Sequence, residues 1–218
     1  SEALAGGKAR IHAGGTDLLG CLHDRVFGAE KLVSLSALDG LRGITPTGEG
    51  GLRIGAMTTI AELAASDAVR TRFTALAGAA SQVASPQLRN QGTLGGNLCQ
   101  KPRCWYYRGE FRCLRKGGDR CFAADGENRY HAILGGVGCY VVHPSDTAPA
   151  LCALGASVRI AGPRGERTVP VDAFHVAPDV EVERETVLEA GDVIAFAGVE
   201  NVKKSVERLR QWSQSSLP

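Results

Sequence analysis

Two glycine-bearing segments constrain this chain more than any other feature of its sequence. Residues 13–17 read Ala-Gly-Gly-Thr-Asp, and residues 92–97 read Gly-Thr-Leu-Gly-Gly-Asn. Adjacent glycines let backbone N–H groups approach a ligand with no Cβ in the way, and the neighbouring Thr and Asn side chains add donors. A single Gly-Gly pair more often marks a tight turn, but two such segments favour a site for phosphate or pyrophosphate.

The residues around the first segment predict a strand, a turn and a helix. A short strand is expected at 9–12 and the opening of a helix at 18–22, with Thr16 or Asp17 as its N-cap. This arrangement gathers free backbone N–H groups at the positive end of a helix dipole, which favours an anion. No Gly-x-Gly-x-x-Gly follows a strand, so a Rossmann-type dinucleotide site is not predicted.

The hydrophobic pattern predicts further strands and helices along the chain. The strand at 31–34 should pair in parallel with 9–12, which gives a small βαβ lobe. From residue 198 onward, valine and leucine fall at helical spacing and predict an amphipathic helix that begins near Val199. The other expected strands are 41–45, 52–56, 157–160, 167–170 and 192–196, and the other expected helices are 73–83, 146–153 and one capped by Thr58 or Thr59.

The composition is that of an ordinary globular protein. Of 218 residues, 44% are apolar and 22% are charged, and the formal net charge of +2 is too small to imply a polyanionic partner. No apolar run approaches the length that spans a bilayer, and no secretory or transit segment is visible. The first residues, 1–5, resemble the middle of a helix, so we expect residues to be missing before them.

Four of the seven cysteines lie in one segment. Cys104, Cys113, Cys121 and Cys139 are separated by eight, seven and seventeen residues, a spacing of neither a zinc ribbon nor a compact ferredoxin. Spacing alone favours structural thiols. Eight Lys and Arg residues around the first three of these cysteines could offset the negative charge of a thiolate-bound cluster. Trp105, Tyr106, Tyr107 and Phe111 could exclude water from it.

The same residues allow a different interpretation. Basic side chains interleaved with aromatic ones also describe a nucleic-acid-binding groove. The remaining thiols, Cys21, Cys99 and Cys152, are expected to be free and buried. His131 and His143 are expected to be structural, with His143 orienting the loop that presents Asp146.

Three motifs in order resemble the FAD-binding medium subunit of the xanthine dehydrogenase family of molybdenum hydroxylases. They are Ala-Gly-Gly-Thr-Asp-Leu-Leu at 13–19, the segment 85–97, and Ser-Asp-x-x-Pro-Ala-Leu at 145–151. The resemblance implies an α+β, two-lobed FAD-binding fold of the PCMH type, with a small parallel βαβ lobe and a larger mixed or antiparallel lobe that carries a cysteine-rich insertion. It implies no catalytic residue here, and these FAD contacts: Ala13, Gly14, Gly15, Thr16, Asp17, Leu18, Thr93, Gly95, Gly96, Asn97, Ser145 and Asp146.

The cysteine-rich insertion indicates which members of the family the chain resembles most. It is similar to the flavoprotein subunit of periplasmic aldehyde oxidoreductases, which carries a [4Fe-4S] cluster, and more distantly to that of hydroxybenzoyl-CoA reductase. The cluster ligands implied are Cys104, Cys113, Cys121 and Cys139. In the reductase the last ligand lies nearer the position of Tyr130, which leaves Cys139 as the first choice here and Cys99 as the second.

The resemblance also implies a domain division and a function. We expect lobes at 1–56 and 57–197, with the iron–sulfur insertion at 98–142, and a helical tail at 198–218 where the family's C-terminal subdomain is expected to be absent. The chain would accept electrons from a [2Fe-2S] subunit, which itself receives them from a molybdenum-cofactor large subunit. It would then pass the electrons through FAD to an external acceptor. No nucleic acid or membrane partner is implied.

Several alternatives remain open from the sequence. They are a hydroxybenzoyl-CoA reductase-like FAD subunit, a flavin oxidase of the vanillyl-alcohol type, for which the substrate domain is missing, and a metal-containing nucleic-acid-binding module. The expected location is the cytoplasm, or the periplasm after co-export with a signal-bearing partner subunit. The substrate and the electron acceptor are not determined.

Overall fold

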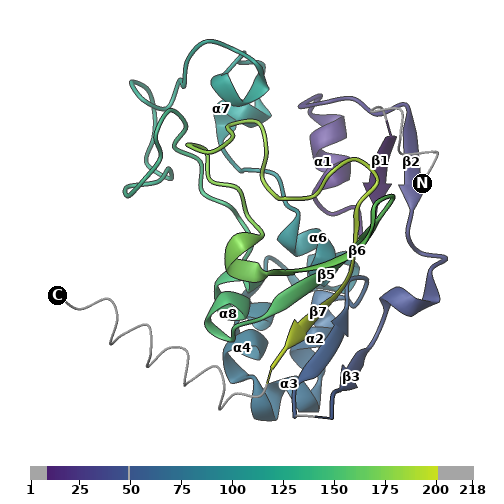
Figure 1. The fold of residues 1–218 in the computed structure, drawn as a ribbon. Helices are drawn as coiled ribbons and strands as arrows, with labels where there is room; N and C mark the ends of the chain where they lie inside the picture. The colour runs from purple at the N-terminus through teal and green to yellow at the C-terminus, as the bar shows by residue number, and fades with distance from the viewer. Residues whose placement is uncertain (1–8, 49, 201–218) are drawn as a thin grey trace.

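The computed structural model describes residues 9–48 and 50–200, and these form two separate sheets (Figure 1). Strands β1 (Ala9–His12) and β2 (Lys31–Ser34) pair in parallel, with Ala9 opposite Lys31. Helix α1 (Leu18–His23) connects them, so the predicted βαβ lobe is confirmed. The second sheet has five antiparallel strands in the order β3-β4-β7-β5-β6. The α+β class and the small parallel lobe beside a larger antiparallel one are therefore confirmed.

The last strand lies at the centre of the larger sheet. Strand β7 pairs antiparallel with β4 on one side and with β5 on the other, and so joins two hairpins that are about a hundred residues apart in the sequence. The first hairpin falls within the expected lobe 1–56, yet it is hydrogen bonded into the second sheet through β7. The strands are β3 (Ile44–Pro46), β4 (Leu52–Gly55), β5 (Ser157–Gly162), β6 (Gly165–Pro170) and β7 (Val193–Val199).

Strand β7 also corrects one expectation. Val199, predicted as the start of an amphipathic helix, is the last residue of the strand and is buried. Val199 and Ala197, two positions apart, are both buried in the core, and this pairing into the sheet overrides the helical spacing seen in the sequence. The rest of the predicted helix, 201–218, and the segment 1–5 lie outside the described residues.

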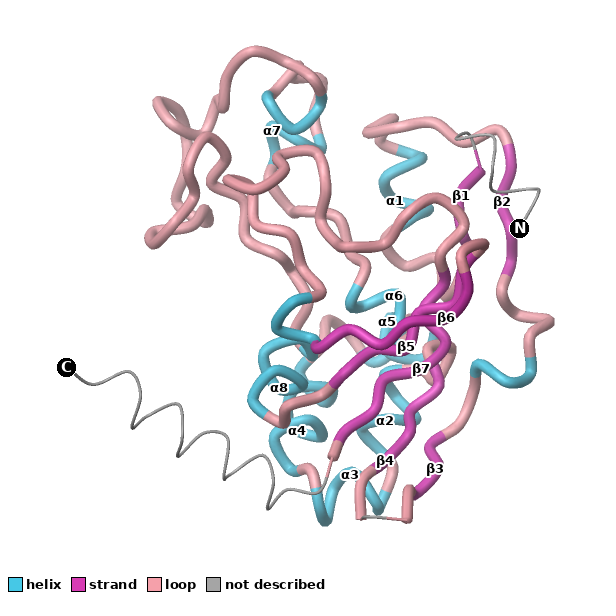
Figure 2. The backbone as a smooth tube through the Cα atoms, viewed as in Figure 1, coloured by secondary structure: helices cyan, strands magenta, loops and turns pink. Residues whose placement is uncertain are grey.

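Short helices cover one face of the larger sheet (Figure 2). Thr59 caps α2 through a capping box with Glu62, which confirms the predicted start of that helix. The predicted helices at 73–83 and 146–153 are also present, whereas α3, α5 and α6 were not predicted. The helices on this face are α2 (Ile60–Ala65), α3 (Asp67–Arg72), α4 (Thr74–Gln82), α5 (Pro86–Gln91), α6 (Leu94–Leu98) and α8 (Thr147–Ala153). Helix α7 (Trp105–Arg108), which was also not predicted, lies in the cysteine-rich segment.

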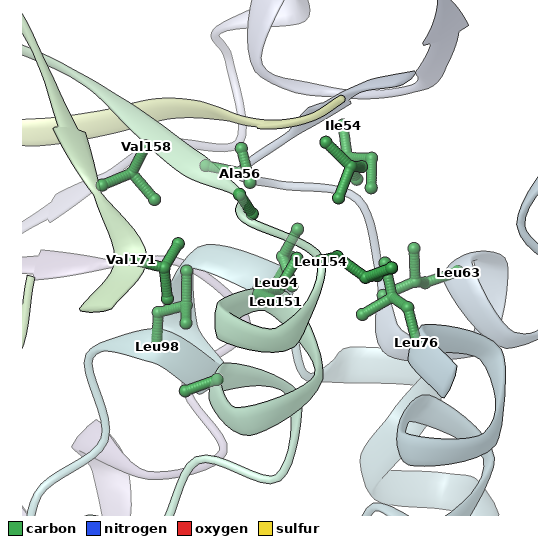
Figure 3. Packing of buried hydrophobic residues seen from close by; sticks show 14 of the residues in the cluster. Ile54, Ala56, Leu63, Leu76, Leu94, Leu98, Leu151, Leu154, Val158 and Val171 are labelled. Atoms are coloured by element: carbon green, nitrogen blue, oxygen red, sulfur yellow. The ribbon is translucent and has the colours of Figure 1, made fainter. Parts of the chain in front are cut away.

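The core lies between the sheet and these helices (Figure 3). Ile54 and Val158 from the strands pack with Leu63, Leu76 and Leu151 from α2, α4 and α8, and each of these side chains is fully buried. Burying an aliphatic side chain of this size contributes roughly 1.5–3 kcal/mol. Helix α6 is anchored in the same core through Leu94 and Leu98, and this fixes the second glycine pair against a rigid base.

The cysteine-rich segment has little regular structure and lies beside the small lobe (Figure 1). It contains α7 and a 3₁₀ helix, Leu114–Lys116. A second apolar cluster joins the two parts, because Cys21 and Val26 of the small lobe pack with Tyr107 and Cys113 of the insertion. In the described part of the chain, no helix is long and apolar enough to cross a membrane.

Candidate functional site

A cavity of about 610 Å³ opens where the small lobe, α6 and the insertion meet. All six predicted FAD contacts of the first segment line it. Basic side chains of the insertion, which sequence reasoning did not assign to this site, line it as well. We call this cavity the cofactor pocket. Its walls include Ala13, Gly14, Gly15, Thr16, Asp17 and Leu18, then Thr93, Gly96 and Cys99, then Lys101, Tyr107, Arg115 and Lys116.

The first glycine pair is required by its surroundings. A Cβ on Gly14 would lie 1.8 Å from the carbonyl oxygen of Gln91, and Gly15 has a φ of +76°, which L side chains rarely adopt. The two predicted glycine segments are therefore in direct contact. Among the described residues, the backbone N–H groups of 14–18 donate to no protein acceptor, so this loop offers free donors to the pocket.

The second glycine pair differs from the loop expected from the sequence. Gly95 and Gly96 lie in the first turn of α6, whose N-cap Thr93 accepts a hydrogen bond from the Gly96 N–H at 3.1 Å. The Gly95 N–H donates to the carbonyl of Ala56, and a Cβ on Gly95 would lie 3.0 Å from that of Ala56. Gly95 therefore packs closely against Ala56, and Thr93 and Gly96 line the cofactor pocket.

Asn97 joins the second segment to the third. Its buried Oδ1 accepts hydrogen bonds from the hydroxyls of Ser145, at 2.7 Å, and Thr147, at 2.6 Å. Asp146 is exposed at the N-cap of α8, without a side-chain capping bond. Asn97, Ser145 and Asp146 are not among the residues that line the cofactor pocket in the described chain, and their contact with FAD stays a prediction.

Asp17 connects the first segment to the insertion. It occupies the N-cap position of α1 but makes no side-chain capping bond, contrary to its expected role. Instead its carboxylate accepts from the Lys101 N–H and from Arg108, each at 2.8 Å, and pairs with Arg103 at 3.1 Å. The backbone of the pocket loop is therefore held by the segment that carries the cysteines.

An apolar cavity of about 170 Å³ adjoins the cofactor pocket. The two cavities share four lining residues, so together they offer a charged compartment beside an apolar one. Such a pair of compartments suits a ligand with an anionic part and an aromatic part. The shared residues are Ile11, Ala13, Gly96 and Cys99. The apolar cavity is also lined by Leu35, Met57, Leu188 and Ile194, and by Gly95, one of the predicted FAD contacts.

The four cysteines predicted as ligands converge on one small cavity. Cys104, Cys113, Cys121 and Cys139 all line it, and we call it the cysteine cavity. Burial is the main cause that raises the pKa of the Cys104 thiol, and Cys113 and Cys139 are close enough to raise it further. In the described chain, however, no three His, Cys, Asp or Glu side chains lie close enough together to hold a metal ion.

The remaining cysteines are placed differently from one another. Cys99, the alternative fourth ligand, lines the cofactor pocket and not the cysteine cavity. Cys21 is fully buried, as predicted, and Cys99 is half-buried. Cys152 is exposed, so its predicted burial was wrong. It lies on α8 beside the buried Leu151, one position away from the face that packs into the core.

The two histidines singled out in the sequence occupy different surroundings. His131 lines the cysteine cavity, and its Nε2 lies 3.1 Å from the Cys104 sulfur. His143 accepts the Ser145 N–H on Nδ1, which fits the expected role of orienting that loop. Burial, with the His175 ring 4.0 Å away, lowers the pKa of His143 to about 3, so its ring is neutral at physiological pH.

Sequence reasoning missed a buried charged group behind the pocket. Glu185 accepts from Arg115 at 2.7 Å and also pairs with Lys101. The side chains of Arg115 and Glu185 are 3% and 7% exposed, so this ion pair lies almost wholly out of water. The basic run between the cysteines signalled such cations, but nothing local indicated that a carboxylate seventy residues later would meet them.

The chain is similar to known proteins over most of its length. The family model described as the FAD binding domain in molybdopterin dehydrogenase matches residues 2–195. The aldehyde oxidoreductase FAD-binding subunit PaoB of Escherichia coli K12 is 37% identical over 190 residues, which are 85% of this chain and 59% of PaoB. The xanthine dehydrogenase FAD-binding subunit of Escherichia coli O157:H7 is 31% identical over 184 residues, or 84% of this chain and 49% of that protein.

Solved structures show the same similarity. Carbon monoxide dehydrogenase from Hydrogenophaga pseudoflava superposes with a TM-score of 0.65 at 28% identity, over 92% of this chain and 55% of that one. Quinoline 2-oxidoreductase from Pseudomonas putida 86 gives 0.64 at 26%, over 92% and 54%. This chain therefore spans about half the length of the proteins that it resembles.

Proposed function

Because the chain belongs to the family of FAD-binding subunits of molybdenum hydroxylases of the xanthine dehydrogenase type, we propose that it binds FAD in the cofactor pocket and transfers electrons through it. The observation that carries this proposal is the meeting of free N–H groups at 14–18 with an apolar cavity next to them. FAD combines an anionic diphosphate with aromatic rings, so its chemistry suits both compartments.

The contacts proposed for FAD follow from the lining of the pocket. Residues 13–18 would hold the diphosphate through their backbone, and Thr93 and Gly96 face it from the other wall. Gly14 and Gly95 also bring segments together, because Gly14 packs against the backbone of Gln91 and Gly95 packs against Ala56. When bound, the flavin supplies the electron chemistry, while these residues bind and orient it and shield it from water.

We also propose that the cysteine cavity holds a [4Fe-4S] cluster. Its support is the convergence of Cys104, Cys113, Cys121 and Cys139 on one cavity, from positions far apart in the segment. Four thiolates are the usual protein ligands of such a cluster, and a bound cluster supplies one-electron transfer. His131 and Arg115 line the same cavity, so potential hydrogen-bond donors to cluster sulfur are close by.

The proposed place of the chain in a larger enzyme rests on its relatives. Electrons would pass from a molybdenum-cofactor large subunit to a [2Fe-2S] small subunit and then to FAD here. Among the relatives, PaoB is named as an aldehyde oxidoreductase subunit, which favours an aldehyde as the substrate of the partner subunit. The expected location stays the cytoplasm or, by co-export, the periplasm.

Anaerobic purification with cofactor analysis tests the proposal. We expect one FAD, released on denaturation, and about four irons per chain. Nucleic acid in place of flavin would favour the alternative of a nucleic-acid-binding module. Flavin without iron would support the proposed FAD binding and contradict the proposed cluster.

A further inference from the structure

Two residues of the insertion line both the cofactor pocket and the cysteine cavity. They are Tyr107, in α7, and Arg115, in the 3₁₀ helix. Both are buried, each with 6% of its surface exposed. The two side chains therefore form a shared wall between the sites, and a charge on this wall acts on both at once.

Arg115 is the source of that charge. Burial is the main cause that raises the pKa of the Tyr107 hydroxyl, so this residue is neutral at physiological pH. Arginine is always protonated in proteins, and Arg115 is held by hydrogen bonds from Nη1 to Glu185 at 2.7 Å and to the Arg184 carbonyl at 3.2 Å. Lys101 pairs with the same carboxylate, so the two cations exceed the one anion and the group is positive overall.

One donor of Arg115 is also unused. Its Nε–H is buried and has no acceptor in the described part of the chain. A buried donor without a partner costs free energy, so an acceptor brought by a group in either adjoining cavity would be favoured there. Both groups proposed for these cavities, a diphosphate and a sulfur cluster, are rich in acceptors.

We propose that Arg115 is a positioning residue shared by the two sites, which strengthens binding of the FAD diphosphate in one and raises the reduction potential of the cluster in the other. The inference rests on the proposed function, because it requires both groups. Reduction adds one electron to the cluster, and a buried cation nearby stabilises this more negative state more than the oxidised state. The diphosphate is anionic whatever the redox state of the flavin, so the same cation favours its binding.

The test uses the cofactor-loaded protein in its purified complex, titrated with dithionite and mediator dyes. In Arg115→Met the midpoint potential of the cluster should become more negative, and the Kd for FAD of the flavin-free form should rise about tenfold. Glu185→Gln removes the opposing negative charge, so both quantities should move in the opposite direction. Arg112→Met is the matched control, because this arginine also adjoins a proposed ligand but is exposed.

One further variant and one further ligand test whether the effect comes from the charge of Arg115 and from the diphosphate of FAD. Arg115→Lys retains the charge and should keep most of the FAD affinity, and it serves in place of Arg115→Met if that variant does not fold. Riboflavin lacks the diphosphate, so its Kd should be the same in Arg115→Met and the parent. A parent that binds no flavin would overturn the proposed function, and a parent that binds flavin without iron would overturn the proposed cluster and the part of this inference that concerns it. A loaded parent in which Arg115→Met and Glu185→Gln do not shift the potential and the affinity in opposite directions would overturn this inference alone.

Discussion

Asp17, at the end of the first glycine segment, accepts a hydrogen bond from Arg108 of α7 at 2.8 Å, across a separation of ninety-one residues. The same guanidinium donates from Nη1 to the Cys21 sulfur at 2.9 Å, so one arginine contacts both the loop and the helix of the small lobe. The side chains of Asp17 and Arg108 are 13% and 15% exposed. The wall of the cofactor pocket and the cysteine-rich insertion are thus one connected structure.

This ion pair predicts an effect of Asp17→Asn on both stability and cofactor binding. Removing one partner of a largely buried pair leaves the Arg108 charge uncompensated and should cost about 1–3 kcal/mol of the free energy of unfolding. FAD affinity should fall as well, because the loop loses its anchor. Urea denaturation and FAD titration measure the two effects. Asp24→Asn, at an exposed position just after α1, is the control and should change neither.

Gly14 supports a second prediction. In Gly14→Ala the new Cβ would collide with the Gln91 carbonyl, and the shift needed to relieve this overlap should destabilise the protein by about 1–3 kcal/mol or more. FAD binding should weaken because the two glycine segments are forced apart, not because the methyl group enters the pocket. Gly20→Ala, in α1 with open space around its Cβ, should be neutral or slightly stabilising. Equal melting temperatures for the two variants would contradict this account of the loop.

His143 makes stability depend on pH. Its pKa is lowered to about 3 in the folded protein, chiefly by burial, against 6.5 for an ordinary histidine. The folded state therefore binds fewer protons than the unfolded state, and stability that is complete above pH 6.5 should be lost progressively as the pH falls toward 3. The loss is on the order of a few kcal/mol.

Urea denaturation between pH 4 and pH 8 measures this effect, with the expected slope below about pH 6.5. In His143→Asn the slope should flatten, because asparagine can still accept the Ser145 N–H but does not titrate. His23→Asn, on the exposed end of α1, should keep the slope of the parent. A parent whose stability is constant over this range would argue against a buried neutral His143.

The cysteine cavity predicts which thiols hold iron. Cys104→Ser, Cys113→Ser, Cys121→Ser and Cys139→Ser should each lose most of the iron, because a serine oxygen is a poor substitute for a cluster thiolate. Cys99→Ser should retain it, since Cys99 lies in the cofactor pocket, and the exposed Cys152→Ser is the control. Iron loss in Cys99→Ser together with full iron retention in Cys139→Ser would show that Cys99, not Cys139, is the fourth ligand.

The sequence by itself determined several local elements and the family to which the chain belongs. The strand, turn and helix at 9–22, the Thr59 cap and the α8 segment follow from short-range patterns, and these were confirmed. The glycine motifs and their order were enough to identify the family, which the comparisons support. The four cysteines proposed as cluster ligands were chosen from seven by the family resemblance, with the basic and aromatic neighbours of the first three as support.

Only the tertiary structure decided how distant segments meet. No local pattern shows that β7 lies between β4 and β5, so Val199 was assigned to a helix. Likewise, Asp17 fits a helix cap as well as an ion pair, and the choice depends on Arg108, which folding brings to it. In the same way, Arg115 lies between the cofactor pocket and the cysteine cavity, where it is held by Glu185, a residue seventy positions later that folding brings to it. Such contacts gain their free energy only when the core has fixed both partners, and for this reason no reading of neighbouring residues could find them.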